Sequence, residues 1–206
     1  MPEPFDDLAY ELRQQIRGEV RTDPVARLLY STDASIYQVE PGGVAFPRDV
    51  DELHAIVKAA ARYQVPLLAR GAGSSLAGQA IGPGLVVDCS RHLTQILKID
   101  AEARQAVVEP GVVLSALNRA AAAYGLQFGP DPASAERATV GGSLANNATG
   151  AHSILYGMAA DHLLSGEMVL SDGSLANFSE ISLAEAGRRT ASSPNSLEGR
   201  LYRAVL

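Results

Sequence analysis

Residues 70–80 read Arg70-Gly71-Ala72-Gly73-Ser74-Ser75-Leu76-Ala77-Gly78-Gln79-Ala80. An apolar strand expected over residues 65–69 runs directly into this loop. Successive amides of such a Gly/Ser loop converge into a nest that donates to phosphate oxygens, and the hydroxyls of Ser74 and Ser75 add donors. The loop is not a Walker A motif, because Gln79 replaces its Lys, nor a G-x-G-x-x-G motif, because Leu76 replaces a glycine. The loop predicts a diphosphate site, with an irregular connection as the alternative.

A second glycine-rich window lies at residues 128–157. Thr139 fits the N-cap of a short helix whose first turn contains Gly141-Gly142, and free amides there can face an anion. The pair Asn146-Asn147 follows, where it either contacts polar edges of a ligand or caps the helix. These two loops, far apart in the chain, predict one ligand bound from two sides. The alternative is that both glycine-rich windows are simply turns.

The segments around the first loop alternate between strand and helix patterns. A short strand is expected at residues 44–47, followed by a helical stripe in which Asp49 and Glu52 form a capping box. The strand at 65–69 comes next, and the continuous apolar run 85–88 is typical of a strand covered on both faces. We expect an α/β lobe with short parallel strands.

The second half predicts antiparallel pairing, since two pairs of strand-like runs flank short turns. The expected elements are a hairpin at 95–99 and 105–109, a helix at 113–124, a hairpin at 164–170 and 175–178, and a helix at 182–188. At the N-terminus, Leu8, Leu12 and Ile16 predict an amphipathic helix over 4–19. The apolar pattern is unfinished at Leu206, which predicts truncation at the C-terminus.

The composition is that of a globular chain: 206 residues, 47% apolar and 19% charged, with a net charge of −6. With no Lys/Arg cluster, a nucleic-acid partner is not expected. The single Cys89, expected to be buried and unreactive, excludes an intramolecular disulfide. No metal site is expected, because the four His lack partners at ligand spacing. No secretory signal or transmembrane run is expected, and the prediction is a cytoplasmic protein, with peripheral attachment to the inner membrane left open.

Six blocks in fixed order carry a resemblance to a known family: residues 70–79, 108–112, 130–134, 138–142, 146–151 and 156–157. Over about residues 30–178 they resemble the FAD-binding domain of the vanillyl-alcohol oxidase and p-cresol methylhydroxylase (PCMH) family. Within it, the chain is most similar to D-lactate dehydrogenases, D-2-hydroxyglutarate dehydrogenases, the FAD subunit of glycolate oxidase and fusions of that subunit to an iron–sulfur domain.

This resemblance implies an α+β fold, a two-lobed PCMH-type domain with FAD between the lobes. A helical segment at 1–29 would precede a small α/β lobe at about 30–94 and an antiparallel-sheet lobe with helices at about 95–206. FAD would be held without a covalent bond, since the first loop contains no His. Any iron–sulfur cluster would belong to a C-terminal region beyond this chain.

The resemblance also implies the residues that bind the cofactor. They are Arg70, Gly71, Ala72, Gly73, Ser74, Ser75, Gly78 and Gln79 at the diphosphate; Thr139, Val140, Gly141, Gly142, Asn146, Asn147, Gly150, Ala151 and Gly157 on the other side; and Pro130, Asp131 and Ser134 towards the flavin.

The implied function is that of the FAD-binding portion of an oxidoreductase that converts a D-2-hydroxy acid to the 2-oxo acid and passes electrons to an acceptor. Substrate and catalytic groups would lie in a cap domain beyond this chain, so we expect the chain alone to be inactive. Two alternatives remain: a non-catalytic nucleotide-binding module, and a related FAD oxidase acting on a sugar or an aldehyde.

Overall fold

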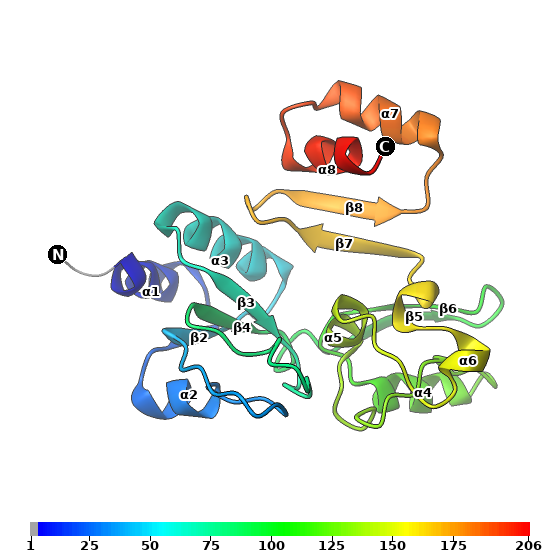
Figure 1. Cartoon of the computed structure of the whole chain (residues 1–206), viewed down its shortest axis with the longest axis horizontal. Coiled ribbons are helices and arrows are strands. Elements are labelled where there is room, and N and C mark those ends of the chain that lie inside the picture. Colours follow the sequence, from blue (N-terminus) through cyan, green and yellow to red (C-terminus); the bar gives the residue numbers. More distant parts are fainter. Residues whose placement is uncertain (1–3) are drawn as a thin grey trace.

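The computed structural model describes residues 4–206, and its first lobe is built on a four-stranded sheet (Figure 1). The strands lie in the order β1 (Glu19–Arg21), β2 (Gly43–Phe46), β4 (Leu85–Asp88) and β3 (Leu67–Arg70). β1 is antiparallel to β2, and the other pairs are parallel. The predicted α/β lobe with short parallel strands is confirmed. Residues 1–3 of the expected N-terminal segment lie outside the described residues.

Helices cover both faces of this sheet (Figure 1). α1 (Pro4–Gln15) and α3 (Val50–Tyr63) lie on one face, where Leu8, Leu12 and Ile56 are fully buried in one cluster with residues of β2 and β4. α2 (Pro24–Leu29) lies on the other face, where Tyr30 follows it and packs on a second cluster of strand side chains. Burial on both faces explains why β2 and β4 are continuously apolar.

Two elements near the N-terminus differ from expectation. The helix expected over 4–19 ends at Gln15, and Glu19–Arg21 instead forms β1 against β2. The turn between them brings the chain so close to the sheet that a Cβ on Gly18 would lie 2.1 Å from Phe46 O. The helix α2 was not expected either, although Asp23-Pro24 is a start signal: Asp23 accepts from Ala26 N at 3.1 Å, and proline occupies the first turn.

Glu52 does not complete the expected capping box. Asp49 accepts from Glu52 N at 2.9 Å, as an N-cap does. The Glu52 carboxylate, however, accepts from the backbone amides of Arg17, Gly18 and Arg48 at 2.9, 3.1 and 2.9 Å. It thereby ties the turn between α1 and β1 to the start of α3. This buried connection needs a chain reversal 35 residues away, which local spacing does not show.

The second lobe begins with the hairpin of β5 (Ile96–Asp100) and β6 (Gln105–Val108), which confirms the expected antiparallel pair. Its helical elements are α4 (Leu114–Ala122), α5 (Val140–Ala145), α6 (Ser153–Tyr156) and the 3-10 helix η1 (Ala159–His162). The core of this lobe gathers side chains of α4 and α5 with the segments before them: Val112, Leu114, Leu117, Ala138 and Val140.

The described residues end in a hairpin and two helices, of which the hairpin and the first helix were expected (Figure 1). These are β7 (Ser165–Val169), β8 (Leu175–Ser179), α7 (Leu183–Ser192) and α8 (Leu197–Val205). The hairpin turn rests on α3, because a Cβ on Gly173 would lie 2.3 Å from Lys58 Cγ. Cys89 is buried, as predicted, and burial followed by the nearby Asp88 charge raises the pKa of its thiol to about 11. No helix within residues 4–206 is long and apolar enough to cross a membrane.

The Glu52 carboxylate supplies the first prediction. Burial raises its pKa, but the amides of Arg48, Arg17 and Gly18 outweigh burial and hold the pKa below its usual value. We expect Glu52→Gln to lower the free energy of unfolding at pH 7 by about 1–3 kcal/mol, since one oxygen facing two of these amides is replaced by a donor. Denaturant titration with circular dichroism measures this.

The stabilising effect of the Glu52 carboxylate should also depend on pH. Because its pKa is lowered, the carboxylate stabilises the fold fully above the unfolded value, near 4.5, and loses this as pH falls through the folded value. The difference between wild type and Glu52→Gln should therefore narrow below pH 4.5. Glu19→Gln, at a half-exposed surface ion pair with Arg91, is the control and should change stability little. Equal stability of wild type and Glu52→Gln at pH 7 would contradict this role.

Candidate functional site

The glycine-rich loop, residues 71–84, leaves the carboxyl end of β3, one of the parallel strands, and returns to the amino end of β4. Neighbouring parallel strands need a crossover of a dozen or more residues, which is usually a helix. Residues 71–84 are all described, and they form no helix. Irregular loops of this length usually carry function, and ligands of α/β sheets bind at the carboxyl ends of the strands. The loop lies where a ligand site is expected.

The first part of this loop, residues 71–79, has backbone amides without a partner among the described residues. None of the amides of residues 71–79 donates a hydrogen bond to any part of the chain that the structure describes. Gly73 and Gly78 have φ of +66° and +80°, a region that favours glycine. Amides in such a loop are the donors that phosphate oxygens need, as the sequence predicts for this segment.

The side chains at the two ends of the loop are engaged within the protein. The Arg70 guanidinium donates to the carbonyls of Thr32 and Ala80, each at 2.9 Å. Ser75 Oγ donates to Gln79 Oε1. The Arg70 side chain therefore stabilises the loop, and the backbone amides of residues 71–79 are the donors left for a ligand.

The two glycine windows meet at one point. A Cβ on Gly71 would lie 2.2 Å from Thr139 Oγ1 and 3.2 Å from Thr139 Cγ2. Thr139 is itself 3% exposed, so its side chain cannot move aside into solvent. The approach of the loops, predicted from their composition, thus depends on the missing side chain at residue 71.

Thr139 is the N-cap of α5, as predicted, but the first turn of this helix offers no free amide. Its amides are paired as follows: Val140 N with Val112 O at 2.8 Å, Gly141 N with Pro110 O at 2.8 Å, and Gly142 N with Thr139 Oγ1 at 3.2 Å. The expectation that these amides face an anion is wrong. The reason is tertiary: an isolated β-bridge joins Thr139 to Val113 and docks the helix start against residues 110–113.

The glycines of α5 serve this docking, and one polar atom nearby is left without a partner. A Cβ on Gly141 would lie 2.6 Å from Pro110 Cβ, so only glycine fits there. Ser143, two residues on, is 4% exposed, and its Oγ has no hydrogen-bond partner among the described residues. Buried hydroxyls are normally paired, so Ser143 Oγ is a polar group that a ligand bound beside α5 could pair with.

Asp131 and His152 form a pair that the sequence did not reveal. Asp131 Oδ1 accepts from His152 N at 3.0 Å, and Oδ2 contacts His152 Nδ1. The backbone amide of His152, then its ring, holds the pKa of Asp131 below its usual value. A Cβ on Gly150 would lie 2.2 Å from Asp131 O. The 21-residue separation has no periodicity, so only the fold brings this pair together.

The side chains of both asparagines of the second window make hydrogen bonds to the backbone of helical segments. Asn146 Nδ2 donates to Gly142 O at 3.0 Å, and Asn147 Oδ1 accepts from Ala160 N at 2.9 Å. Asn147 has φ of +44° and Gly157 φ of +83°, which turn the chain on either side of α6.

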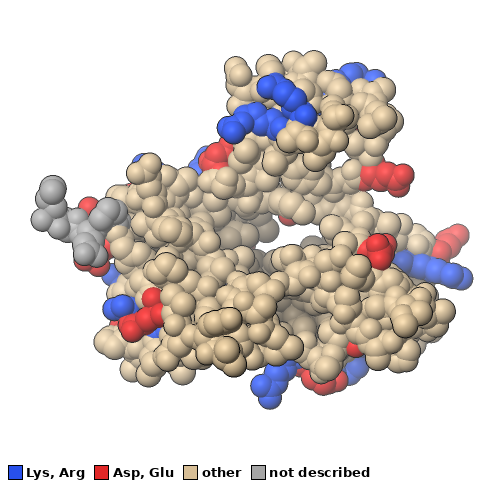
Figure 2. All heavy atoms as spheres, viewed as in Figure 1, with Lys and Arg blue, Asp and Glu red and all other residues tan. Residues whose placement is uncertain are grey.

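The other predicted residues differ in exposure. Gly71, Ser74, Asp131, Ser134 and Gly150 are half-buried, Ala72 and Ala151 are exposed, and Pro130 and Val140 are buried. Figure 2 shows that the molecule is hollowed between its two lobes and that the surface around the hollow is mostly uncharged. Such a surface places little negative charge against an anionic ligand.

These features fit FAD. The unpaired amides of residues 71–79 suit its diphosphate, and the orphaned Ser143 Oγ lies in the helix that meets this loop at Gly71. Within residues 4–206, no three His, Cys, Asp or Glu side chains gather as metal ligands.

Comparison with known proteins gives the same result. A family model described as an FAD binding domain matches residues 41–179. The D-2-hydroxyglutarate dehydrogenase of Escherichia coli is 36% identical over 199 residues, which are 95% of this chain and 19% of that protein. Glycolate oxidase subunit GlcD of Bacillus subtilis is 37% identical over 165 residues, or 78% of this chain and 35% of that protein.

The fold also matches a solved structure of alkyldihydroxyacetonephosphate synthase. The TM-score is 0.75 with 24% identity, over 87% of this chain and 37% of that one. The chain thus spans about a fifth to a third of the length of the curated relatives named here. Because the family model covers more than half of the chain and agrees with the fold, the chain belongs to the FAD binding domain family.

Proposed function

We propose that this chain is the FAD-binding portion of a flavin-dependent oxidoreductase that converts a D-2-hydroxy acid to the corresponding 2-oxo acid. The observation that carries the proposal is the meeting of the two windows at Gly71 and Thr139, beside a loop whose amides are unpaired. The names of the relatives, a D-2-hydroxyglutarate dehydrogenase and a glycolate oxidase subunit, support the substrate class.

The chain's own contribution begins at the diphosphate. Hydrogen bonds to an ionised acceptor are about twice as strong as neutral ones, so several amides of residues 71–79 can replace the water lost by the phosphates. Because these amides have no partner within residues 4–206, binding breaks no hydrogen bond among those residues. Backbone donors suit a chain with net charge −6, which has no basic cluster to offer.

At the other end of the proposed site, Asp131 fixes the ring of His152. A carboxylate without a proton only accepts, so the hydrogen of this contact lies on His152 Nδ1. We propose that Asp131 lies towards the flavin, as the resemblance implies, and that its pair with His152 shapes this edge of the cofactor site. When bound, FAD would accept the hydride from the substrate carbon that carries the hydroxyl group.

Substrate recognition is proposed to lie in a cap domain outside this chain. The matched residues make up 19% of one relative and 35% of the other, so each relative has ample further chain for such a domain. In this scheme, residues 71–79 and the second window hold and orient the cofactor, and the cap domain binds the 2-hydroxy acid carboxylate.

FAD binding is the most immediate prediction. We expect the purified 206-residue chain to quench flavin fluorescence in a saturable titration, with ADP competing, since both ligands present a diphosphate to the same amides. Isothermal titration calorimetry gives the stoichiometry, expected to be one. A flat titration with FAD and with ADP at millimolar concentration would contradict the site.

The Gly71 contact gives a sharper prediction. Gly71→Ala places a Cβ 2.2 Å from Thr139 Oγ1 and forces the two windows apart, so FAD affinity should fall at least tenfold, or about 1.4 kcal/mol. Gly187→Ala is the matched control, because a Cβ there meets nothing within 4 Å. Equal affinity of Gly71→Ala and the control would refute the proposed convergence.

The substrate class is tested on the full-length protein reconstituted with FAD. Mixed without oxygen with D-2-hydroxyglutarate, D-lactate or glycolate, it should lose its visible flavin absorption with at least one of them, and L-2-hydroxyglutarate should have no effect. Bleaching by a sugar or an aldehyde alone would replace the D-2-hydroxy acid with that class. A bound nucleotide without a flavin would leave only a nucleotide-binding module.

A further inference from the structure

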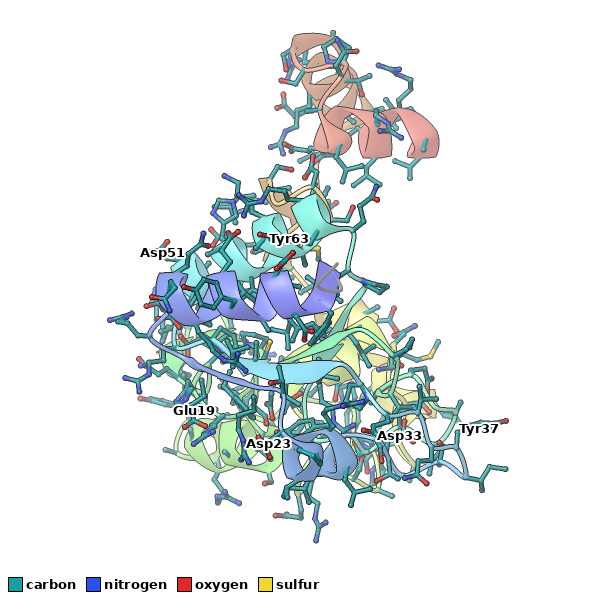
Figure 3. All side chains as sticks on the ribbon, turned by 90° about the vertical axis from the view of Figure 1, so that its left-hand side faces the viewer. Glu19, Asp23, Asp33, Tyr37, Asp51 and Tyr63 are labelled. Atoms are coloured by element: carbon teal, nitrogen blue, oxygen red, sulfur yellow. The ribbon has the colours of Figure 1, made fainter. Side chains whose placement is uncertain are left out.

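A segment outside both glycine windows braces the diphosphate loop. Residues 32–37, here called the bracing segment, lie along residues 71–80. Ala34 N donates to Gly73 O at 3.0 Å, and a Cβ on Gly78 would lie 3.0 Å from Cδ2 of the Tyr37 ring. Figure 3 shows Asp33 and Tyr37 next to each other at one edge of the first lobe. Both positive-φ glycines of the loop therefore lie against the bracing segment: Gly73 accepts the hydrogen bond from Ala34, and Gly78 lies beside the Tyr37 ring.

Asp33 connects the bracing segment to the far end of the loop. Its Oδ1 accepts from Ser35 N at 2.8 Å and its Oδ2 from Ala80 N at 3.3 Å. The first bond shapes the bracing segment itself, and the second fixes the residue that follows the unpaired amides. One carboxylate thus sets the position of the loop end relative to its support.

Arg70 makes the complementary connection from the start of the loop. Its Nη2 donates to Thr32 O and its Nη1 to Ala80 O, both at 2.9 Å. Its guanidinium also lies over the Tyr30 ring, 5.2 Å from the centroid. The planar fork therefore joins the bracing segment to Ala80, the residue that follows the unpaired amides, which a lysine cannot do with one ammonium group.

We propose that Asp33 and Arg70 are positioning residues that hold the amides of residues 71–79 ready for the diphosphate of FAD before the cofactor arrives. The inference rests on the proposed function and assigns a role to residues 32–37. A glycine-rich loop without hydrogen bonds between its own backbone groups has many conformations, and ordering it on binding costs affinity. Contacts already made in the free protein remove part of that cost.

The experiment titrates FAD and ADP into the 206-residue chain and its variants by fluorescence and calorimetry. Asp33→Asn keeps the size of the side chain but leaves one acceptor for two amides, and Arg70→Lys keeps the charge but loses the fork. Each should weaken FAD and ADP by the same factor, about tenfold. The control is Asp172→Asn in the turn between β7 and β8, where Oδ1 likewise accepts from Ser174 N at 2.9 Å, and its affinities should equal those of wild type.

Two readouts separate positioning from a general loss of structure. If both residues act through one loop, the double variant Asp33→Asn/Arg70→Lys should lose much less than the product of the single losses. The loss should also appear in the association rate, because a smaller fraction of the loop is ready to bind. Stopped-flow fluorescence measures that rate, and thermal unfolding without ligand should stay near that of wild type.

The outcomes distinguish the two proposals. Wild-type chain that binds neither FAD nor ADP overturns the proposed function and this inference with it. Wild-type chain that binds both ligands, with Asp33→Asn and Arg70→Lys binding equally well, overturns only the inference. It is also overturned if losses multiply in the double variant, or if Asp172→Asn weakens binding as much as Asp33→Asn does.

Discussion

The contact between Gly71 and Thr139 is the constraint on which the site depends. The two residues come from different lobes, and a single added carbon at residue 71 would fall 2.2 Å from the Thr139 hydroxyl oxygen. Thr139 is in turn fixed as the N-cap of α5 and by its bridge to Val113. The position of the second lobe against the first sheet is therefore set at the same point where the unpaired amides begin.

Elements with strong local patterns were predictable from the sequence. The three parallel strands of the first lobe, the two hairpins and the cap at Thr139 follow from apolar runs, turn residues and capping preferences. The convergence of two glycine windows was also expected, because glycine in such numbers is otherwise a liability in helices and strands.

What the sequence could not show depends on distant partners. The amides of the α5 first turn are paired because residues 110–113 dock against them, so local spacing wrongly leaves them free. The strand Glu19–Arg21 exists only through β2, and the pair of Asp131 and His152 only through a 21-residue loop closure. These features have no periodic signature, since tertiary contacts decide them.

The account claims that the unpaired amides of residues 71–79 receive the cofactor, and amide hydrogen exchange tests this most directly. Without ligand these amides should exchange quickly, because they lack acceptors in the described chain. Saturating FAD should slow exchange in peptides covering 71–79 and leave peptides of α7 unchanged. Binding of FAD with unchanged exchange throughout residues 71–79 would contradict the account.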